Sequence, residues 1–410
     1  MNFLERLLDG VAVEWKALRD VVLPTSNIKW KDTDRIYRYI DLTSVSIETK
    51  KIAETTEITA NNAPSRAQKL VEKNDVIFAT TRPSQQRYCL IDNEYSGEVA
   101  STGYCVLRAK KDEVLPKWIL YCIASNDFKI YVEENQSGSA YPAISDTKVK
   151  DFIIPIPPLK VQAEIVRILD TFTALTAELT AELTAELTDR KKQYNYYRDR
   201  LLTFEKGDVE WKTLGEIVTF RRGSFPQPYG NSNWYDGEGS MPFVQVADVS
   251  DFGFTLIKQT KQRISKLAQP KSVFVKAGTV IVTLQGTIGR VAITQYDCYV
   301  DRTLAIFTGY KENINKKYFA YQLKNTFDME KEHARGSTLK TITKEEFSKF
   351  EIPLPPLEEQ ARIVAILDKF DTLTTSISEG LPREIALRQK QYEYYRDLLL
   401  TFPKPKEIEA

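Results

Sequence analysis

The chain has 410 residues, more than one ordinary hydrophobic core accommodates, and its hydrophobic content of 42% is typical of folded domains rather than disorder. Its 57 Lys and Arg residues are balanced by 56 Asp and Glu, so any surface for nucleic acid must be a local basic patch. One histidine and four cysteines without a Cys-x-x-Cys pair offer no plausible zinc ligand set, and we expect buried thiols at Cys89, Cys105, Cys122 and Cys298.

The N-terminal segment MNFLERLLDG carries charged residues among its first six positions and lacks the apolar stretch of a signal peptide. No run of the chain approaches the roughly 18 apolar residues that span a membrane. We therefore expect a cytoplasmic protein that makes no contact with a membrane.

The first half contains an apolar strand that runs into a polar loop, NDVIFATTRP (Asn74–Pro83). The loop TTRPSQQR (Thr80–Arg87) offers arginine, which pairs with guanine, and glutamine, which pairs with adenine. Polar loops are more often solvated turns, so the loop yields only candidates for DNA contact, namely Arg82, Gln85, Gln86 and Arg87. Farther on, Gly138-Ser139 is compatible with a structural turn and equally with backbone contact to phosphate.

Two segments of the chain recur with the same shift of 198 residues. IPIPPLKVQAEIVRILD matches IPLPPLEEQARIVAILD at 12 of 17 positions, and KQYNYYRDRLLTF matches KQYEYYRDLLLTF at 11 of 13. The motif VEWK also opens each half. The repeated segments, which we call the frames, are Ile154–Asp170 with Ile352–Asp368, Lys192–Phe204 with Lys390–Phe402, and Val13–Lys16 with Val209–Lys212. Repeats of this kind indicate one supersecondary scaffold used twice.

Each I-P-x-P-P-L frame predicts a helix that begins after its last proline, near Leu159 and Leu357. Apolar residues then recur at steps of three and four, which predicts a seam along which the two helices pack antiparallel. Two unrelated surface helices are the alternative. The second helix should break at Gly380-Leu381-Pro382. The predicted seam residues are Ile165, Ile168, Phe172, Leu175 and Leu179, and Ile363, Ile366, Phe370, Leu373 and Ile377.

The first of these helices contains the tetrapeptide TAEL three times in succession, over Thr176–Leu187. Ala, Glu and Leu are strong helix formers, and a unit of four residues places each Leu about one turn above the last. A copy can therefore be gained or lost without breaking the helix, so the array is a device for setting length. The alternative is a stable helix whose length does not matter.

The second half repeats the organisation with different sequences between its frames, so that Leu18–Gln136 and Leu214–Arg335 share only weak echoes. The strand GTVIVTLQGT (Gly278–Thr287) corresponds to the strand at Asn74–Pro83, and Gly336-Ser337 corresponds to Gly138-Ser139. The candidates for DNA contact in this half lie in FRRGSFPQPYGNSNW and after the strand, and they are Arg221, Arg222, Gln227, Gln285 and Arg290. Near-identical frames around unlike segments suggest one scaffold that presents two different readers, as we call Leu18–Gln136 and Leu214–Arg335.

The two ends of the chain look like the two parts of its internal junction. RLLTFEKGDVEWKTL (Arg200–Leu214) joins the first helix to the second half. The N-terminal RLLDGVAVEWKAL (Arg6–Leu18) matches the end of that junction, and the C-terminal YYRDLLLTF (Tyr394–Phe402) matches its beginning. We therefore expect the two ends of the chain to be neighbours in space.

Together, the paired I-P-x-P-P-L-x-x-Q-x-x-I frames, the TAEL array and the KQYxYYRDxLLxF helix ends resemble the specificity subunit of type I DNA restriction–modification enzymes. The resemblance covers the whole chain. It is closest to the subgroup, type IC, whose first spacer helix holds TAEL repeats. In that family each of two target recognition domains reads half of a split DNA site, and the spacer helices dock two methyltransferase subunits.

The resemblance implies a mixed α/β fold with two strand-rich target recognition domains, separated by two long antiparallel helices that form a coiled coil with pseudo-twofold symmetry. The implied boundaries are residues 1–157 and 206–355 for the recognition domains, 158–205 for the first spacer helix, and 356–410 for the second spacer helix and tail. The implied partners are double-stranded DNA, two methyltransferase subunits and motor–nuclease subunits. S-adenosylmethionine, ATP and magnesium are expected on those partners, with no cofactor in this chain.

The residues themselves agree that this chain is not an enzyme on its own. It lacks the G-x-x-x-x-G-K-[ST] loop that cradles ATP phosphates. Ile156 and Leu354 precede the double prolines, where an amino-methyltransferase needs Asn or Asp, and GTIGR (Gly286–Arg290) is too short for a dinucleotide turn. No catalytic triad is recognisable. The alternative function is a coiled-coil scaffold that joins protein partners without touching DNA.

Overall fold

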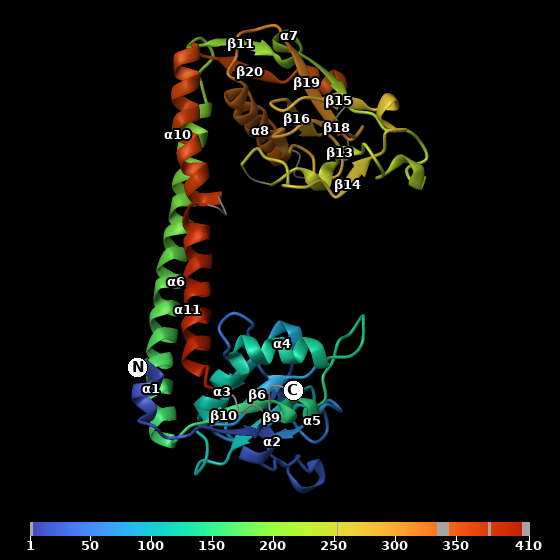
Figure 1. The fold of residues 1–410 in the computed structure, drawn as a ribbon. Coiled ribbons are helices and arrows are strands. Elements are labelled where there is room, and N and C mark those ends of the chain that lie inside the picture. The colour runs from blue at the N-terminus through green and yellow to red at the C-terminus, as the bar shows by residue number, and fades with distance from the viewer. Residues whose placement is uncertain (1–2, 252, 334–343, 376–378, 404–410) are drawn as a thin grey trace. The chain divides into compact units, whose positions relative to one another are not determined.

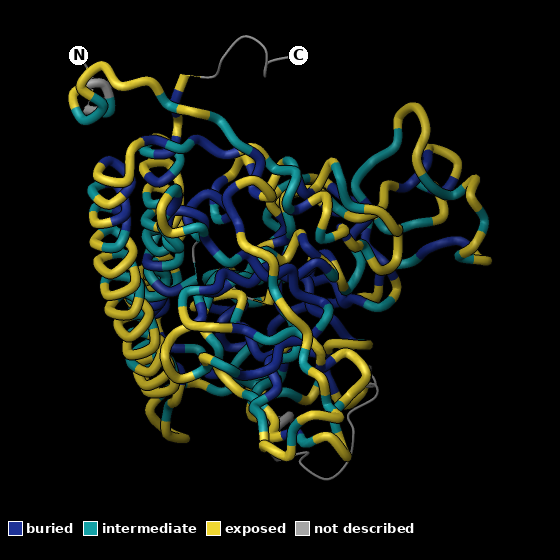
Figure 2. The backbone as a smooth tube through the Cα atoms, turned by 90° about the horizontal axis from the view of Figure 1, so that it is seen from below, coloured by how far each residue is buried: buried dark blue, intermediate teal, exposed yellow. Residues whose placement is uncertain are grey.

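The structure, a computed structural model, describes residues 3–251, 253–333, 344–375 and 379–403. The chain forms two compact units: unit 1 comprises Met1–Thr180 with Leu387–Ala410, and unit 2 comprises Ala181–Ala386. Each unit combines a strand-rich domain with its own portion of the long helices (Figure 1). Buried residues concentrate in the strand-rich domains, whereas the long helices are largely exposed or half-buried (Figure 2). The predicted mixed α/β fold with two strand-rich domains and a long helix is confirmed.

The domain of unit 1 is built on two four-stranded sheets with hydrophobic cores between and beside them. The first sheet has the strand order β2 (Val22–Leu23), β9 (Tyr104–Ala109), β6 (Val76–Ala79) and β7 (Tyr88–Leu90). The second has the order β4 (Thr56–Ile58), β3 (Tyr37–Ile40), β8 (Val99–Ser101) and β5 (Ala67–Leu70). Neighbouring strands are antiparallel except for the parallel pair β3 and β8.

The domain of unit 2 has the same two sheets in the same strand order. The first sheet runs β12 (Val218–Arg222), β19 (Leu304–Tyr310), β16 (Val280–Thr283) and β17 (Val291–Ile293). The second runs β14 (Gln262–Ile264), β13 (Met241–Val244), β18 (Cys298–Val300) and β15 (Val273–Val275), with β13 and β18 as its parallel pair. Two sequences that diverge almost completely between the frames therefore fold into one topology, and β6 corresponds to β16 as expected from the sequence.

The VEWK motifs form the base of each domain. In unit 1, β1 (Glu14–Ala17) pairs antiparallel with β10 (Ile153–Ile156), so that Trp15 lies opposite Pro155. In unit 2, β11 (Glu210–Thr213) pairs in the same way with β20 (Glu351–Leu354). Each ribbon therefore joins two of the repeated frames, which explains why these segments match while the readers do not.

Helices complete both domains. Unit 1 has α1 (Phe3–Leu8), α2 (Leu18–Val21), α3 (Pro116–Ala124), α4 (Asn126–Asn135) and α5 (Asp146–Asp151). Unit 2 has α7 (Leu214–Ile217), α8 (Lys316–His333) and α9 (Lys344–Ser348). Short 3-10 turns are η1 (Trp30–Asp32), η2 (Pro83–Gln85), η3 (Ser232–Trp234), η4 (Val246–Asp248) and η5 (Gln269–Lys271). No described helix is both long and apolar enough to cross a membrane. All four cysteines are buried and unpaired, as expected.

The spacer helices begin where the prolines predict. α6 covers Leu159–Leu202 as one helix of 44 residues, and α10 covers Leu357–Thr375. The second helix is interrupted as expected, because α11 begins only at Leu381, after Gly380 with a φ of +77°. In unit 1 the first part of α6 meets the end of α11 through Phe172 and Tyr395, whose ring centroids lie 6.1 Å apart. In unit 2 the end of α6 meets α10, with Tyr197 stacked on Phe370 at 5.6 Å. Both pairs are antiparallel.

The seam of α6 departs from the prediction at one position. Ile165 is buried, but Leu175 is 56% exposed, and the neighbouring Thr176 is half-buried instead. The prediction stepped by three from Phe172, whereas the helix steps by four there and by three afterwards to Leu179. Steps of three and four satisfy the same periodicity, so only the partner helix decides between them. In α10, Ile363, Ile366, Phe370 and Leu373 are buried or half-buried, and Ile377 lies outside the described residues.

In each unit, one buried glutamine joins the strand-rich domain to its long helix. The Gln162 Oε1 atom accepts a 2.9 Å bond from the Leu115 backbone, and its amide donates to the carbonyls of Glu113 and Pro157. Gln360 accepts from Asn315 at 2.9 Å and donates to Pro355 at 2.8 Å. Both side chains are at most 1% exposed. Losing either would leave buried backbone groups unpaired, at a cost of about 1–3 kcal/mol.

A second contact that the two units share lies about two helical turns farther along α6 and α10. The Asp170 carboxylate of α6 accepts from the Tyr121 hydroxyl at 2.7 Å and pairs with Lys117 at 2.6 Å. In unit 2 the Asp368 carboxylate of α10 binds Tyr321 at 2.9 Å and Lys317 at 2.8 Å. The frames therefore supply the carboxylate and the glutamine, and each divergent domain supplies the matching Lys and Tyr.

The two ends of the chain are neighbours within unit 1, as the sequence predicted. The Trp15 indole donates a 3.1 Å hydrogen bond to the Pro403 carbonyl. Phe402 is 3% exposed and packs against Trp118, with ring centroids 6.1 Å apart. Phe204, the counterpart of Phe402 in the repeat, is partly buried and packs against the core of unit 2.

We expect a circular permutant that joins Phe402 to the N-terminal segment, and opens the chain near Gly207, to fold and function. Gly207 is exposed, and a side chain added there would meet no atom within 4 Å, so cutting at this point removes no packing. Thermal unfolding and methylation by the assembled complex measure the outcome. The prediction would be contradicted if the permutant stayed unfolded although its linker was long enough to span the gap.

Candidate nucleic-acid interface

The two candidate loops leave equivalent strands at equivalent positions. The backbone N–H of Ala79, at the end of β6, donates to the Arg87 carbonyl at 2.8 Å, and Thr283 at the end of β16 donates to the Arg290 carbonyl at 2.9 Å. Arg87 directly precedes β7, and Arg290 directly precedes β17. The two loops that were selected from the sequence as candidates for DNA contact therefore occupy equivalent structural positions, although their sequences differ.

The arginine at this position connects its loop to another turn, the one that follows β3 in unit 1 and the one that follows β13 in unit 2. The Arg87 guanidinium donates to the Val45 carbonyl at 2.6 Å and to Gln85 at 3.2 Å. The Arg290 guanidinium forms a 2.5 Å ion pair with Asp251 and is only 22% exposed. Both side chains thus hold a loop in place. The charge of Arg290 is balanced by Asp251, whereas Arg87 bonds only to neutral oxygens in the described residues.

Arg82 lies at the tip of the first loop and is exposed. Its backbone N–H donates to the Pro142 carbonyl at 2.7 Å, and its guanidinium lies 5.4 Å from the ring of Tyr141. Among the described residues no carboxylate pairs with it. The neighbouring turn depends on Gly138, because a Cβ there would lie 2.9 Å from the Tyr141 carbonyl and φ is +93°. The structure thus brings Arg82 and Gly138-Ser139 together, while Gly336-Ser337 lies outside the described residues.

The two glutamines of this loop differ in exposure. Gln85 is exposed, whereas Gln86 is half-buried and its amide donates to Pro83 at 3.2 Å. The Gln86 carbonyl accepts a hydrogen bond from Lys50, whose ammonium nitrogen also lies 4.7 Å from the ring centroid of Tyr88. Lys50 was missed by sequence reasoning, because it comes from the turn after β3, more than 30 residues away, and no local pattern marks it.

Burial, assisted by the nearby charge of Arg87, lowers the pKa of Lys50 to about 8 from its ordinary value of 10.5. Between those two values the unfolded chain binds more protons than the folded one, so the free energy of unfolding rises as the pH rises through this window. We expect Lys50→Met to lose this gain, which is on the order of 1 kcal/mol after allowing for solvent screening. Urea denaturation at about pH 7 and about pH 10.5 measures the difference between the variant and the unmodified protein. Lys51→Met, at an exposed neighbour, is the control, and equal pH slopes for all three proteins would contradict the prediction.

In unit 2 the candidates lie at or beyond the ends of two strands of one sheet, β12 and β16. Arg221 and Arg222 are exposed at the end of β12, and Gln285 is half-buried two residues after the end of β16. The loops after both strands are held to the start of β19, since Gly223 donates to the Leu304 carbonyl and Leu284 donates to the Thr303 carbonyl. The structure therefore brings Arg221, Arg222 and Gln285 to the same end of this sheet. Gln227 is exposed and farther along the loop after β12, joined to Pro228 by a cis peptide bond.

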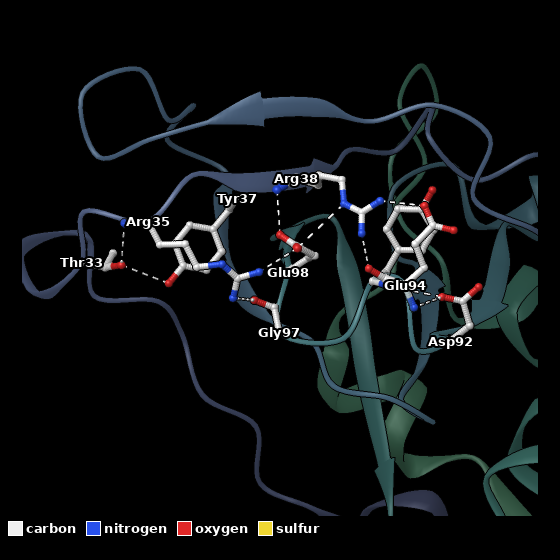
Figure 3. Close-up of polar contacts among 9 residues, drawn as sticks. Thr33, Arg35, Tyr37, Arg38, Asp92, Glu94, Gly97 and Glu98 are labelled. Carbon is white, nitrogen blue, oxygen red and sulfur yellow. Dashed lines mark hydrogen bonds and ion pairs between the residues drawn. The ribbon is translucent and has the colours of Figure 1, made fainter.

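Two other arginines of unit 1, Arg35 and Arg38, are already paired with carboxylates. Figure 3 shows Glu98, whose side chain is 8% exposed, accepting from Arg35 at 2.8 Å and from the Arg38 backbone at 2.7 Å. The Arg38 guanidinium also pairs with Glu94 at 2.7 Å. These arginines stabilise the domain and carry little net charge toward a ligand, in contrast to Arg82.

Comparison with known proteins adds to this geometry. Residues 13–189 and 206–387 match the family described as the type I restriction modification DNA specificity domain. The chain belongs to this family. The two matched ranges correspond to the two halves that the frames define, so the internal repeat is a duplication of the family's domain.

Full-length specificity subunits are similar to this chain. It is 36% identical over all of its length, and 99% of the relative's, to the type I restriction enzyme EcoR124I/EcoR124II specificity subunit of Escherichia coli. It is 30% identical to a putative type I restriction enzyme specificity subunit of Haemophilus influenzae, with 98% of each chain covered. The resemblance stated from the frames and the TAEL array is thereby confirmed at the level of the type I specificity subunit.

Two solved structures share the fold. A chain from a study of complex assembly and conformational transition in the type I R-M system matches with a TM-score of 0.75 at 27% identity, covering 95% of this chain and 98% of that one. The HsdS subunit of Thermoanaerobacter tengcongensis matches with a TM-score of 0.56 at 27% identity, covering 95% and 96% of the two chains. Both relatives span the whole architecture of this specificity subunit.

Proposed function

We propose that this chain is the subunit of a type I restriction–modification complex that selects the DNA target, and that it reads an asymmetric target in two parts. Unit 1 carries the reader for one half-site and unit 2 carries the reader for the other, with domain boundaries at residues 1–157 and 206–355. The frames and spacer helices dock two methyltransferase subunits, and motor–nuclease subunits join them. S-adenosylmethionine, ATP and magnesium serve those partners.

The observation that carries this proposal is one topology with two sets of loops. The sheets and the domain-to-helix contacts through Gln162 and Gln360 recur, whereas the loops after β6 and β16 differ in length and composition. Direct readout needs different side chains for different bases, while the scaffold that positions them can stay constant. A scaffold that only joined proteins would have no reason to vary these loops.

The proposed DNA contacts come from the end of β12 and from the loops after β6, β12 and β16. They are Arg82, Gln85, Gln86, Arg87, Arg221, Arg222, Gln227, Gln285 and Arg290. Exposed Arg82 and Arg221 are the strongest of these, since no carboxylate among the described residues pairs with either. Arg87 and Arg290 contribute by positioning their loops.

The test uses the purified chain with and without its methyltransferase subunits. Gel shifts over a panel of duplexes, at several salt concentrations, should show sequence-dependent binding by the complex. The chain alone should transfer no methyl group to DNA. Equal binding to all duplexes would favour the scaffold function, and methyl transfer by the isolated polypeptide would overturn the proposal.

A further inference from the structure

A shallow hollow in unit 2 adjoins the candidate loops and was missed by sequence reasoning. It is lined by Tyr229, the turn 245–247 after β13 and the turn 301–303 after β18. A Cβ on Gly286, in the loop after β16, would lie 3.7 Å from Val246, so the hollow borders the loop that carries Gln285.

Two close backbone contacts bring the loop after β12 into this hollow. Gly223 packs so tightly on β18 that a Cβ there would lie 2.1 Å from the Val300 carbonyl, so only glycine fits. Ser224 then donates to the same carbonyl at 3.1 Å. The chain is thereby directed toward the turn after β18, where the Tyr229 hydroxyl donates to the Asp301 carboxylate.

Asp301 is the fixed centre of the hollow. It is 3% exposed, and besides Tyr229 it accepts from the backbone of Thr303 at 3.0 Å and from its hydroxyl at 2.6 Å. A buried carboxylate satisfied by three donors holds its neighbours in one geometry. The turn that carries Arg302 is therefore rigid.

Arg302 is the exposed cation of this hollow. Its guanidinium carbon lies 5.1 Å from the ring centroid of Tyr229, within the range of a cation–π contact. No carboxylate among the described residues forms an ion pair with it. Contact with Tyr229 restrains the guanidinium, and because the side chain is exposed, donors on its solvent side can reach a ligand.

We propose that Arg302, held against the ring of Tyr229, reads a guanine in the half-site bound by unit 2. The inference rests on the proposed function and adds the base class that this hollow selects. A fixed guanidinium presents two parallel N–H donors, which match the O6 and N7 acceptors of guanine in the major groove. A guanidinium can also bind phosphate, but a phosphate contact carries no sequence information, so base discrimination separates the two kinds of contact.

The first domain differs at this point. The Thr303 carbonyl accepts from Leu284, as the Gly103 carbonyl accepts from Thr80, so Arg302 corresponds to Thr102. Thr102 has no guanidinium to offer, and its backbone N–H donates to the Arg66 carbonyl at 2.8 Å. The two readers therefore carry different chemistry at the same place in the fold, as unlike half-sites require.

The experiment measures base discrimination by the complex of this chain with its methyltransferase subunits. A duplex library, randomised in the half-site assigned to unit 2, is selected with the unmodified protein and with Arg302→Lys. We expect Arg302→Lys to bind with similar salt dependence but to lose about 5- to 100-fold discrimination at one G·C pair. Tyr229→Phe, which keeps the ring, should retain more discrimination than Tyr229→Ala.

Lys276→Ala is the control for a sequence-independent loss, because it removes one exposed positive charge, whereas Arg302→Lys keeps the charge. Lys276 precedes β16, whereas Gln285 follows it, so the control lies at the opposite end of the strand from the hollow. Its effect should be uniform across sequences. A uniform loss with Arg302→Lys, or none, would overturn the inference.

A measurement on the DNA gives an independent answer. Replacing the selected guanine by 7-deazaguanine removes the N7 acceptor, so binding by the unmodified complex should weaken while the Arg302→Lys complex changes little. Equal weakening of both complexes would place the contact elsewhere and overturn the assignment. If the unmodified complex binds every library member alike, the proposed function itself fails, which is a distinguishable result.

Discussion

Replacing Leu18–Gln136 with the first reader of another type I specificity subunit is expected to change one half of the DNA target and leave the other half intact. The physical reason is that each unit folds around cores of its own. The clusters centred on Phe78 and Ile77 belong to unit 1, and those centred on Phe307 and Ile281 belong to unit 2. Methylation mapping of a host genome, with the chimaera as its only specificity subunit, measures the outcome.

The graft succeeds only if the new reader attaches to the old helix. Asp170 and Gln162 remain in the frame, and the graft must supply the partners that Lys117, Trp118 and Leu115 provide in this chain. A matched control keeps the helix α3 of this chain and exchanges only the residues before it. A change in both half-sites for the control would show that the units do not read independently.

Much of this architecture could be predicted because the frames occur twice in the sequence. The prolines of each frame fix where a helix can begin, and α6 and α10 start at Leu159 and Leu357 as expected. The neighbouring ends followed from matching one junction to both termini, and the hydrogen bond between Trp15 and Pro403 confirms them. Repetition supplies the comparison that a single copy lacks.

What could not be predicted depends on contacts between distant residues. The contact of Tyr229 with Asp301 spans 72 positions, and no local spacing reveals it. The shared strand order of the two domains was equally hidden, because buried strands tolerate any apolar side chains that fill the same volume. The misassigned Leu175 has the same origin, since its exposure depends on the partner helix.

Deleting one TAEL unit, Thr184–Leu187, is expected to shorten the unread spacer of the target by about one base pair and to leave both half-sites unchanged. The array lies within the single helix α6, where Leu179, Leu183 and Leu187 are all half-buried. Removing four residues takes away about 6 Å of helix and a net rotation of about 40°. One base pair of B-DNA rises about 3.4 Å and turns about 34–36°.

The rotation of the helix, rather than its length, is expected to determine the change in the spacer. The angles nearly agree, while the helix loses about 2.6 Å more length than one base pair supplies. A reader turned onto the wrong face of the duplex loses its groove, whereas a small axial error can be absorbed by deformation of the DNA. The deletion also leaves the apolar steps of the helix in register, apart from a local change in winding. The spacer should therefore follow the rotation.

Deleting only two residues of the array, such as Glu186 and Leu187, is the matched control. Two residues turn a helix by about 200°, so the reader should face away from its groove on any spacer of similar length and methylation should be lost. Substituting Thr184→Ala keeps the length and should leave the spacer as it is. Methylation profiling of the three variants measures these outcomes. An unchanged spacer after the four-residue deletion, or altered bases in either half-site, would show that the array does not set the spacing.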